Sequence, residues 1–140
     1  MASDLSVHIQ DTPLSDTHEH LRKENDWVDD GPADVLCDLF SNYVPADLIS
    51  AGADADAVQR LTDPASGDLA SRLTAVEPAW RAIRHTGYGE AVRILAEEIY
   101  EMPADWGPAD LEAAQEKLTA WRQPGGRRRL LEEVGGIDHT

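Results

Sequence analysis

The sequence is short of cysteine and of long hydrophobic runs. Cys37 is the single cysteine among 140 residues, which excludes an intramolecular disulfide and a cysteine-based zinc cluster and is typical of a reducing compartment. Residues 1–10 hold no apolar run long enough for a signal peptide, and no later run could span a bilayer. We therefore expect a cytoplasmic location and no membrane partner.

Positive charge is also scarce. The chain has 12 Lys and Arg against 27 Asp and Glu, which gives a net charge of -15. Nucleic acids and anionic membranes attract positive potential, so we expect neither as a partner. Hydrophobic residues make up 41% of the chain, more than a disordered acidic tail carries, and the length suits one domain with a modest core.

Helix signals recur along most of the chain. The tripeptide Pro-Ala-Asp begins at Pro32, Pro45, Pro103 and Pro108. Proline suits the first turn of a helix because it has no N–H to leave unpaired, and aspartate there faces the positive end of the helix dipole. The irregular spacing indicates helix starts and not a structural repeat. Apolar residues at steps of three and four predict helices over 34–41, 46–51, 54–61, 69–83, 88–102, 108–121 and 127–134, and one or two turns over 3–9.

The helical pattern is interrupted at two places. Pro78 lies inside the 69–83 pattern, and an interior proline costs about 3 kcal/mol, so a kink or a restart is expected near Glu77. The charged stretch 22–31 ends in an Asp-Asp-Gly turn signature before Pro32 and is interpreted as a loop. Residues 137–140 look like the approach to a further element.

One stretch has the pattern of a chemical site. Residues 14–21 read Leu-Ser-Asp-Thr-His-Glu-His-Leu, and their alternation favours a short strand in which Asp16, His18 and His20 share one face. Two imidazoles on one face can bind a single divalent cation, because neutral imidazole is a good ligand for zinc and related metals. His18 and His20 are therefore predicted metal ligands, and a chance His-x-His pair is the alternative.

The strand raises a question of pairing. A lone strand leaves its backbone N–H and C=O groups without partners, so either it is absent or its neighbours lie outside this sequence. Packing explains the other distinctive residues: the arginines at 127–129 are expected to pair with Glu132 and Glu133, and two of the four tryptophans, Trp80 and Trp121, fall on helix core faces. Cys37 is expected to be an inert, buried thiol.

The run Asp-Thr-His-Glu-His-Leu at 16–21 resembles the amidohydrolase superfamily. In that family the first barrel strand ends in a His-x-His that supplies two ligands to a catalytic divalent metal. The run looks most like the branch of uronate isomerases and amidohydrolase-2 proteins. The segments Asp-Leu-Phe at 38–40, Asn-Tyr-Val at 42–44, Ala-Asp-Leu at 46–48 and Thr-Gly-Tyr at 86–88 are similar to the helical segment that these proteins insert after strand one.

The resemblance implies a fold that is mostly α with one or two short strands, the N-terminal fragment of a (β/α)8 TIM barrel. Residues 1–140 would be a single partial domain. Residues 1–21 would form an N-terminal helix and the first barrel strand, and residues 22–140 a helical segment. The further metal ligands and acid or base residues of the family come from later strands, so catalysis requires further chain.

The resemblance also implies roles for particular residues. His18 and His20 would bind a divalent metal, zinc or else manganese, and Asp16 would support them from one layer deeper. Tyr43 is a candidate substrate contact by position. The reaction on a small-molecule substrate would be hydrolysis or an aldose–ketose isomerisation.

A second hypothesis is a small acidic helical protein that acts through contacts with other proteins and catalyses nothing. In it the His-x-His is incidental, and the chain is a compact monomer. The barrel hypothesis instead predicts exposed apolar surface, and with it self-association.

Overall fold

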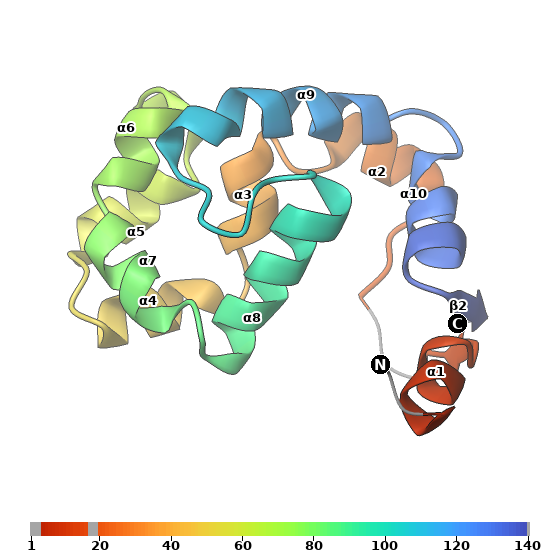
Figure 1. The fold of residues 1–140 in the computed structure, drawn as a ribbon. Coiled ribbons are helices and arrows are strands. Elements are labelled where there is room, and N and C mark those ends of the chain that lie inside the picture. Colours follow the sequence, from red (N-terminus) through yellow and green to blue (C-terminus); the bar gives the residue numbers. More distant parts are fainter. Residues whose placement is uncertain (1–3, 17–19, 140) are drawn as a thin grey trace.

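The computed structural model describes residues 4–16 and 20–139. The fold is mostly helical, as expected, and includes a two-stranded parallel sheet. Figure 1 shows helices α3 to α9 gathered in one body, with α10, α1 and the strands to one side of it. None of the described helices has both the length and the hydrophobicity needed to cross a bilayer.

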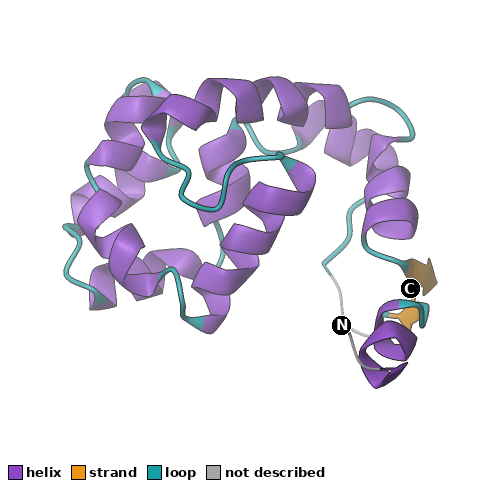
Figure 2. Ribbon diagram, in the orientation of Figure 1, coloured by secondary structure: helices purple, strands orange, loops and turns teal. Residues whose placement is uncertain are grey.

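The helices correspond closely to the segments predicted from apolar spacing (Figure 2). In chain order the α-helices are α1 (Asp4–Gln10), α2 (Glu24–Asp30), α3 (Val35–Phe40), α4 (Val44–Ser50), α5 (Ala55–Leu61), α6 (Leu69–Thr74), α7 (Glu77–Ile83), α8 (Gly87–Ile94), α9 (Leu111–Trp121) and α10 (Gly126–Arg129). Short 3-10 turns form η1 (Pro64–Ser66) and η3 (Pro108–Asp110), and π-helical turns form η2 (Leu95–Ile99) and η4 (Leu130–Val134).

Local capping explains several of the helix starts. Asp34 and Asp54 each accept a hydrogen bond from the backbone N–H three residues on, at 2.9 and 3.0 Å, and so begin α3 and α5. The predicted restart near Glu77 is confirmed, because α6 ends at Thr74 and α7 begins at Glu77 with Pro78 in its first turn.

The prediction of a loop over residues 22–31 is wrong, because α2 occupies most of that stretch. Its support comes from the other end of the chain. Arg122 donates to the carbonyl oxygens of Val28 and Pro32 at 2.8 and 2.9 Å. The Glu24 carboxylate accepts from the N–H of Gly125 at 2.7 Å. Helix α2 is charged and has no buried residues to hold it in place. The bonds from Arg122 stabilise it by giving partners to carbonyl groups at its C-terminal end.

The two strands come from opposite ends of the sequence and pair in parallel. Strand β1 (Leu14–Ser15) lies beside β2 (Ile137–His139), and the N–H of Leu14 donates to the Gly136 carbonyl at 2.9 Å. The expected strand over 14–21 therefore ends at Ser15 in the described chain. The expectation that every neighbour of this strand lies outside the sequence is wrong, because β2 is a neighbour within it. Strand β2 is formed by the C-terminal residues that were expected to lead into a further element.

The core is centred on α3. Phe40 packs edge-on against Trp80 with ring centroids 5.2 Å apart, and Trp80 contacts Trp106 at 5.4 Å. All three are at most 7% exposed. Of the two tryptophans expected on core faces, Trp80 is buried and Trp121 is half-buried. The remaining large side chains that are fully buried include Leu36, Leu48, Leu61, Leu73, Leu111 and Leu118.

One ion pair is buried with this core. The Arg72 side chain donates to the Asp34 carboxylate and to the carbonyl oxygen of Leu61, and Arg72 and Asp34 are 4% and 8% exposed. The pair joins the start of α3, the end of α5 and the middle of α6. Removing one partner leaves the other charge buried without compensation.

We expect Arg72→Met to lower the free energy of unfolding by about 3–5 kcal/mol, since the Asp34 carboxylate loses its counter-ion in the core. Urea denaturation measures the change. Arg81→Met is the matched control: Arg81 pairs with Glu77 at 2.6 Å but its side chain is 72% exposed, so the loss should stay within about 0.5 kcal/mol. Equal losses in the two variants would contradict the importance of the buried pair.

Candidate functional site

The residues predicted to form a metal site follow β1 in the sequence. Asp16 follows the strand directly and is half-buried. His18 lies outside the described residues, so the structure does not place it beside His20. His20 is exposed and lines a cavity of about 330 Å³. We call this the His20 cavity.

The His20 cavity is bounded by residues from distant parts of the sequence. They are Trp27 from α2, Asp38 from α3, Asn42 from the link between α3 and α4, and Arg127 from α10. Asp38 and Arg127 bring opposite charges to its wall. The cavity therefore joins the predicted histidine to a carboxylate and a guanidinium that the sequence pattern did not place in a site.

Asp38 is paired with a buried tyrosine. The Tyr100 hydroxyl donates to the Asp38 carboxylate. Burial raises the pKa of Asp38, and the Tyr100 hydrogen bond and the Arg127 charge oppose that rise. The pKa of Tyr100 is also raised, by burial and by the neighbouring Asp38 charge. The one sequence signal for this pair was a carboxylate inside the apolar run Val-Leu-Cys-Asp-Leu-Phe of α3. Perturbed carboxyl groups that line cavities are candidates for function.

Arg127 has a different role from the one predicted for it. Its guanidinium lies over the Trp27 ring, 5.3 Å from the centroid, and Arg129 lies over Trp121 at 4.9 Å. Within the described part of the chain only Arg128 of the three forms the expected ion pair, with Glu132 at 2.9 Å. The Trp27 partner of Arg127 could not be found from sequence because it is far away along the chain, whereas Trp121 lies close to Arg129 in the sequence.

Asn42 has a left-handed backbone, with a φ of 63°. Few non-glycine residues adopt this conformation, and asparagine is among the best suited to it. The conformation turns the chain sharply between α3 and α4 and puts Asn42 against the His20 cavity. Backbone strain of this kind concentrates at functional sites.

Tyr43, the candidate substrate contact, lies on the surface and is 63% exposed. Its ring stacks on Tyr88 with centroids 5.2 Å apart. Its neighbour Asn42 lines the His20 cavity, and Tyr43 is not among the lining residues. Cys37 is half-buried, donates from Sγ to the Thr62 carbonyl at 3.2 Å and has a pKa raised mainly by burial, as an inert thiol would.

Of the two predicted metal ligands, the structure describes His20 and not His18. Among residues 4–16 and 20–139 there is no group of three or more His, Cys, Asp or Glu residues placed to hold an ion. His20 offers one imidazole, and zinc takes three or four protein ligands. A metal at this point would need His18 and further donors.

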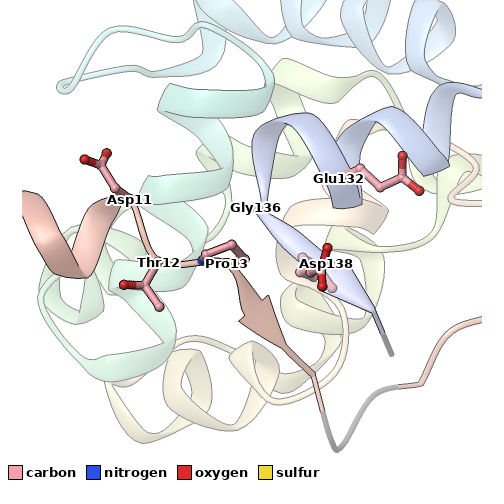
Figure 3. Close-up of a pocket in the computed structure, with 7 residues that line it drawn as sticks. Asp11, Thr12, Pro13, Glu132, Gly136 and Asp138 are labelled. Atoms are coloured by element: carbon pink, nitrogen blue, oxygen red, sulfur yellow. The ribbon is translucent and has the colours of Figure 1, made fainter.

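Another cavity, of about 500 Å³, lies beside the start of the strands (Figure 3). It is lined by Asp11, Thr12 and Pro13, which precede β1, by Glu132 and Gly136, which precede β2, and by Ile137 and Asp138 of β2 itself. Figure 3 shows both strand arrows pointing the same way, so this cavity is at their amino ends. In barrels of parallel strands the amino ends serve stability, and catalysis takes place at the carboxyl ends.

Asp38→Asn should make the protein more stable at neutral pH. Because the pKa of folded Asp38 lies above its ordinary value of 3.8, the unfolded chain loses this proton first, and wild-type stability falls as pH rises through the raised pKa. Asparagine has no such titration and can still accept from Tyr100. The gain over wild type, measured by urea denaturation, should vanish as pH falls to about 3.8.

Asp105→Asn, a change at an exposed carboxyl, is the control for this measurement. A loss of stability in Asp38→Asn at neutral pH, or a gain that does not depend on pH, would contradict a burial cost at Asp38.

No protein-family model, curated protein or solved structure matches this chain.

Proposed function

We propose that this chain is the N-terminal part of a metal-dependent enzyme of the amidohydrolase kind, a hydrolase or a uronate isomerase-like enzyme. One observation carries the proposal: β1 and β2 are parallel, and the His-x-His segment follows the carboxyl end of β1. All strands of a (β/α)8 barrel are parallel, and their carboxyl ends hold the active site. The chain order of strand, histidines, helices and strand agrees with the first unit of such a barrel.

The connection between the strands supports the same proposal. Parallel strands need a crossover, usually helical, and here it consists of residues 16–136. A barrel whose first strand is followed by a helical insertion would have this order. Two short parallel strands are also marginal by themselves, and no third described strand pairs with them. Further barrel strands would supply the missing pairing.

The proposed chemistry needs both histidines. His18 and His20 would hold zinc or manganese through neutral imidazoles, with Asp16 behind them and the remaining ligands supplied by later strands. Such a metal polarises a substrate oxygen or lowers the pKa of a bound water. The Asp38 carboxylate and the Arg127 guanidinium would face a small-molecule substrate in the His20 cavity. Tyr43 remains a candidate substrate contact.

The double variant His18→Ala with His20→Ala tests the metal site. We expect wild-type protein to bind zinc or manganese in a calorimetric titration, and the variant to lose at least about tenfold in affinity because both imidazoles are gone. His8→Ala with His85→Ala is the matched control, since both of those side chains are exposed elsewhere in the chain. Unchanged binding in the first variant would contradict the assignment of His18 and His20.

The second candidate function is an acidic helical protein that acts through contacts with other proteins. Exposed apolar side chains distinguish the two candidates: Leu5 and Ile9 on α1 are 66% and 63% exposed, and Leu14 on β1 is 56% exposed, as the barrel hypothesis predicts and a compact monomer does not. Parallel sheets are normally covered on both faces. An uncovered strand pair of this kind is a surface for the rest of a barrel, or for a partner protein.

This surface predicts self-association. We expect the size of the wild-type protein on gel filtration to increase with concentration, and Leu14→Lys to reduce that increase by charging the exposed strand. Ile49→Lys is the control, because Ile49 is similarly exposed, at 49%, but lies on α4. A wild-type protein that stays monomeric at all concentrations would favour the compact helical alternative.

A further inference from the structure

A second cavity adjoins the His20 cavity and is lined mainly by hydrocarbon. Its volume is about 610 Å³, and the two cavities share Trp27, Asp38, Asn42 and Arg127. Ligand pockets commonly have volumes of about 300–1,000 Å³ and apolar walls with a few polar groups. We call this one the apolar cavity. It lies between the end of α8 with η2 on one side and η4 on the other.

Both walls of the apolar cavity are π-helical turns. Leu95 and Ile99 come from η2, and Leu131 and Val134 come from η4. The π-helix accounts for well under 1% of residues in soluble proteins and frequently occurs at functional sites. Leu95 and Val134 remain 38% and 42% exposed, so the apolar surface of these turns is not covered by the described chain.

Arg127 provides unused hydrogen-bond donors at the same place. A guanidinium carries five N–H donors, and none from Arg127 donates to a described residue, since its contact is with the Trp27 ring. The Trp27 Nε1–H is buried and also lacks an acceptor in the described part of the chain. The Asp38 carboxylate, by contrast, already accepts from Tyr100. The carboxylate of Glu98 lines the same cavity. Arg127 and Trp27 thus offer donors to a ligand, and a negatively charged acceptor would pair with the Arg127 guanidinium.

We propose that the apolar cavity binds a carboxylic acid with an apolar body, the carboxylate against Arg127 and the hydrocarbon between η2 and η4. A carboxylate matches the planar fork of a guanidinium and can take two parallel hydrogen bonds from it. The hydrocarbon would remove the exposed faces of Leu95 and Val134 from water. The site shares Arg127 and Asp38 with the His20 cavity but uses neither His18 nor His20, so it does not depend on the proposed metal.

Octanoate is the probe, and octan-1-ol is the matched uncharged control with the same hydrocarbon tail. We expect octanoate to bind at a single site and to change the fluorescence of Trp27 and Trp121, which both line the cavity. Octan-1-ol should bind at least about tenfold more weakly, because it cannot pair with the guanidinium. Arg127→Gln should weaken octanoate by a similar factor. Arg128→Gln should not, since that side chain pairs with Glu132 on the surface.

Three results would overturn the proposal: no saturable octanoate binding, equal affinity for octanoate and octan-1-ol, or equal affinity in the Arg127→Gln and Arg128→Gln variants. The comparison of octanoate with octan-1-ol uses the wild-type protein and holds even if Arg127→Gln fails to fold. Octanoate binding that survives in His18→Ala with His20→Ala, while metal binding is lost there, separates this site from the proposed metal site.

Discussion

The ion pair between Asp34 and Arg72 is the interaction on which the helical body depends. Asp34 caps α3 through the Cys37 N–H and also accepts from Arg72, which in turn satisfies the Leu61 carbonyl at the end of α5. The neighbouring Val35 N–H donates to Gln115 of α9 at 2.9 Å, so the first turn of α3 is tied to three other helices. A buried charge pair is costly to desolvate, and the hydrogen bonds to the Cys37 N–H and the Leu61 carbonyl offset part of this cost, while the buried Arg72 Nε has no described partner. The pair fixes the position of the helix that carries Asp38.

That position sets the chemistry of the two adjoining cavities. Asp38 is one turn along α3 from Asp34, and its N–H donates to the Asp34 carbonyl at 3.2 Å. The rest of the core holds its carboxylate in a place where ionisation is unfavourable, and α10 brings Arg127 to the same point. A protein that served only as a stable scaffold would gain from an uncharged side chain at Asp38. Three features near the cavities reduce stability: the Asp38 carboxylate, the left-handed Asn42, and the Arg127 donors that have no acceptor in the described part of the chain. Such departures are expected where a site is kept for a ligand.

Local physics explains which features were predictable. The starts of α3 and α5 and the break before Pro78 follow from caps and proline, which act within one turn. The helix over 22–31 was missed because Arg122, some ninety residues later, supplies the partners for its carbonyls. The pairing of β1 with Ile137 and the cation–π contact of Arg127 with Trp27 are equally long-range. The sequence singled out His20, but the acid and base beside it came from elements whose packing no spacing rule gives. The metal role of His18 and His20 stays a prediction.

The β1–β2 pair has a consequence for how the chain folds. Pairing Leu14 with Ile137 closes a loop that contains all the helices from α2 to η4. Closing so long a loop costs chain entropy, and this cost is small only after the helices inside the loop have packed together. The helical body must therefore pack first, from contacts between neighbours such as α4 with α5 and α7 with α8. The strands join last and, with few bonds between them, separate first. Strand β1, which leads directly into Asp16, therefore belongs to the least cooperative part of the described chain and takes its place at the end of folding.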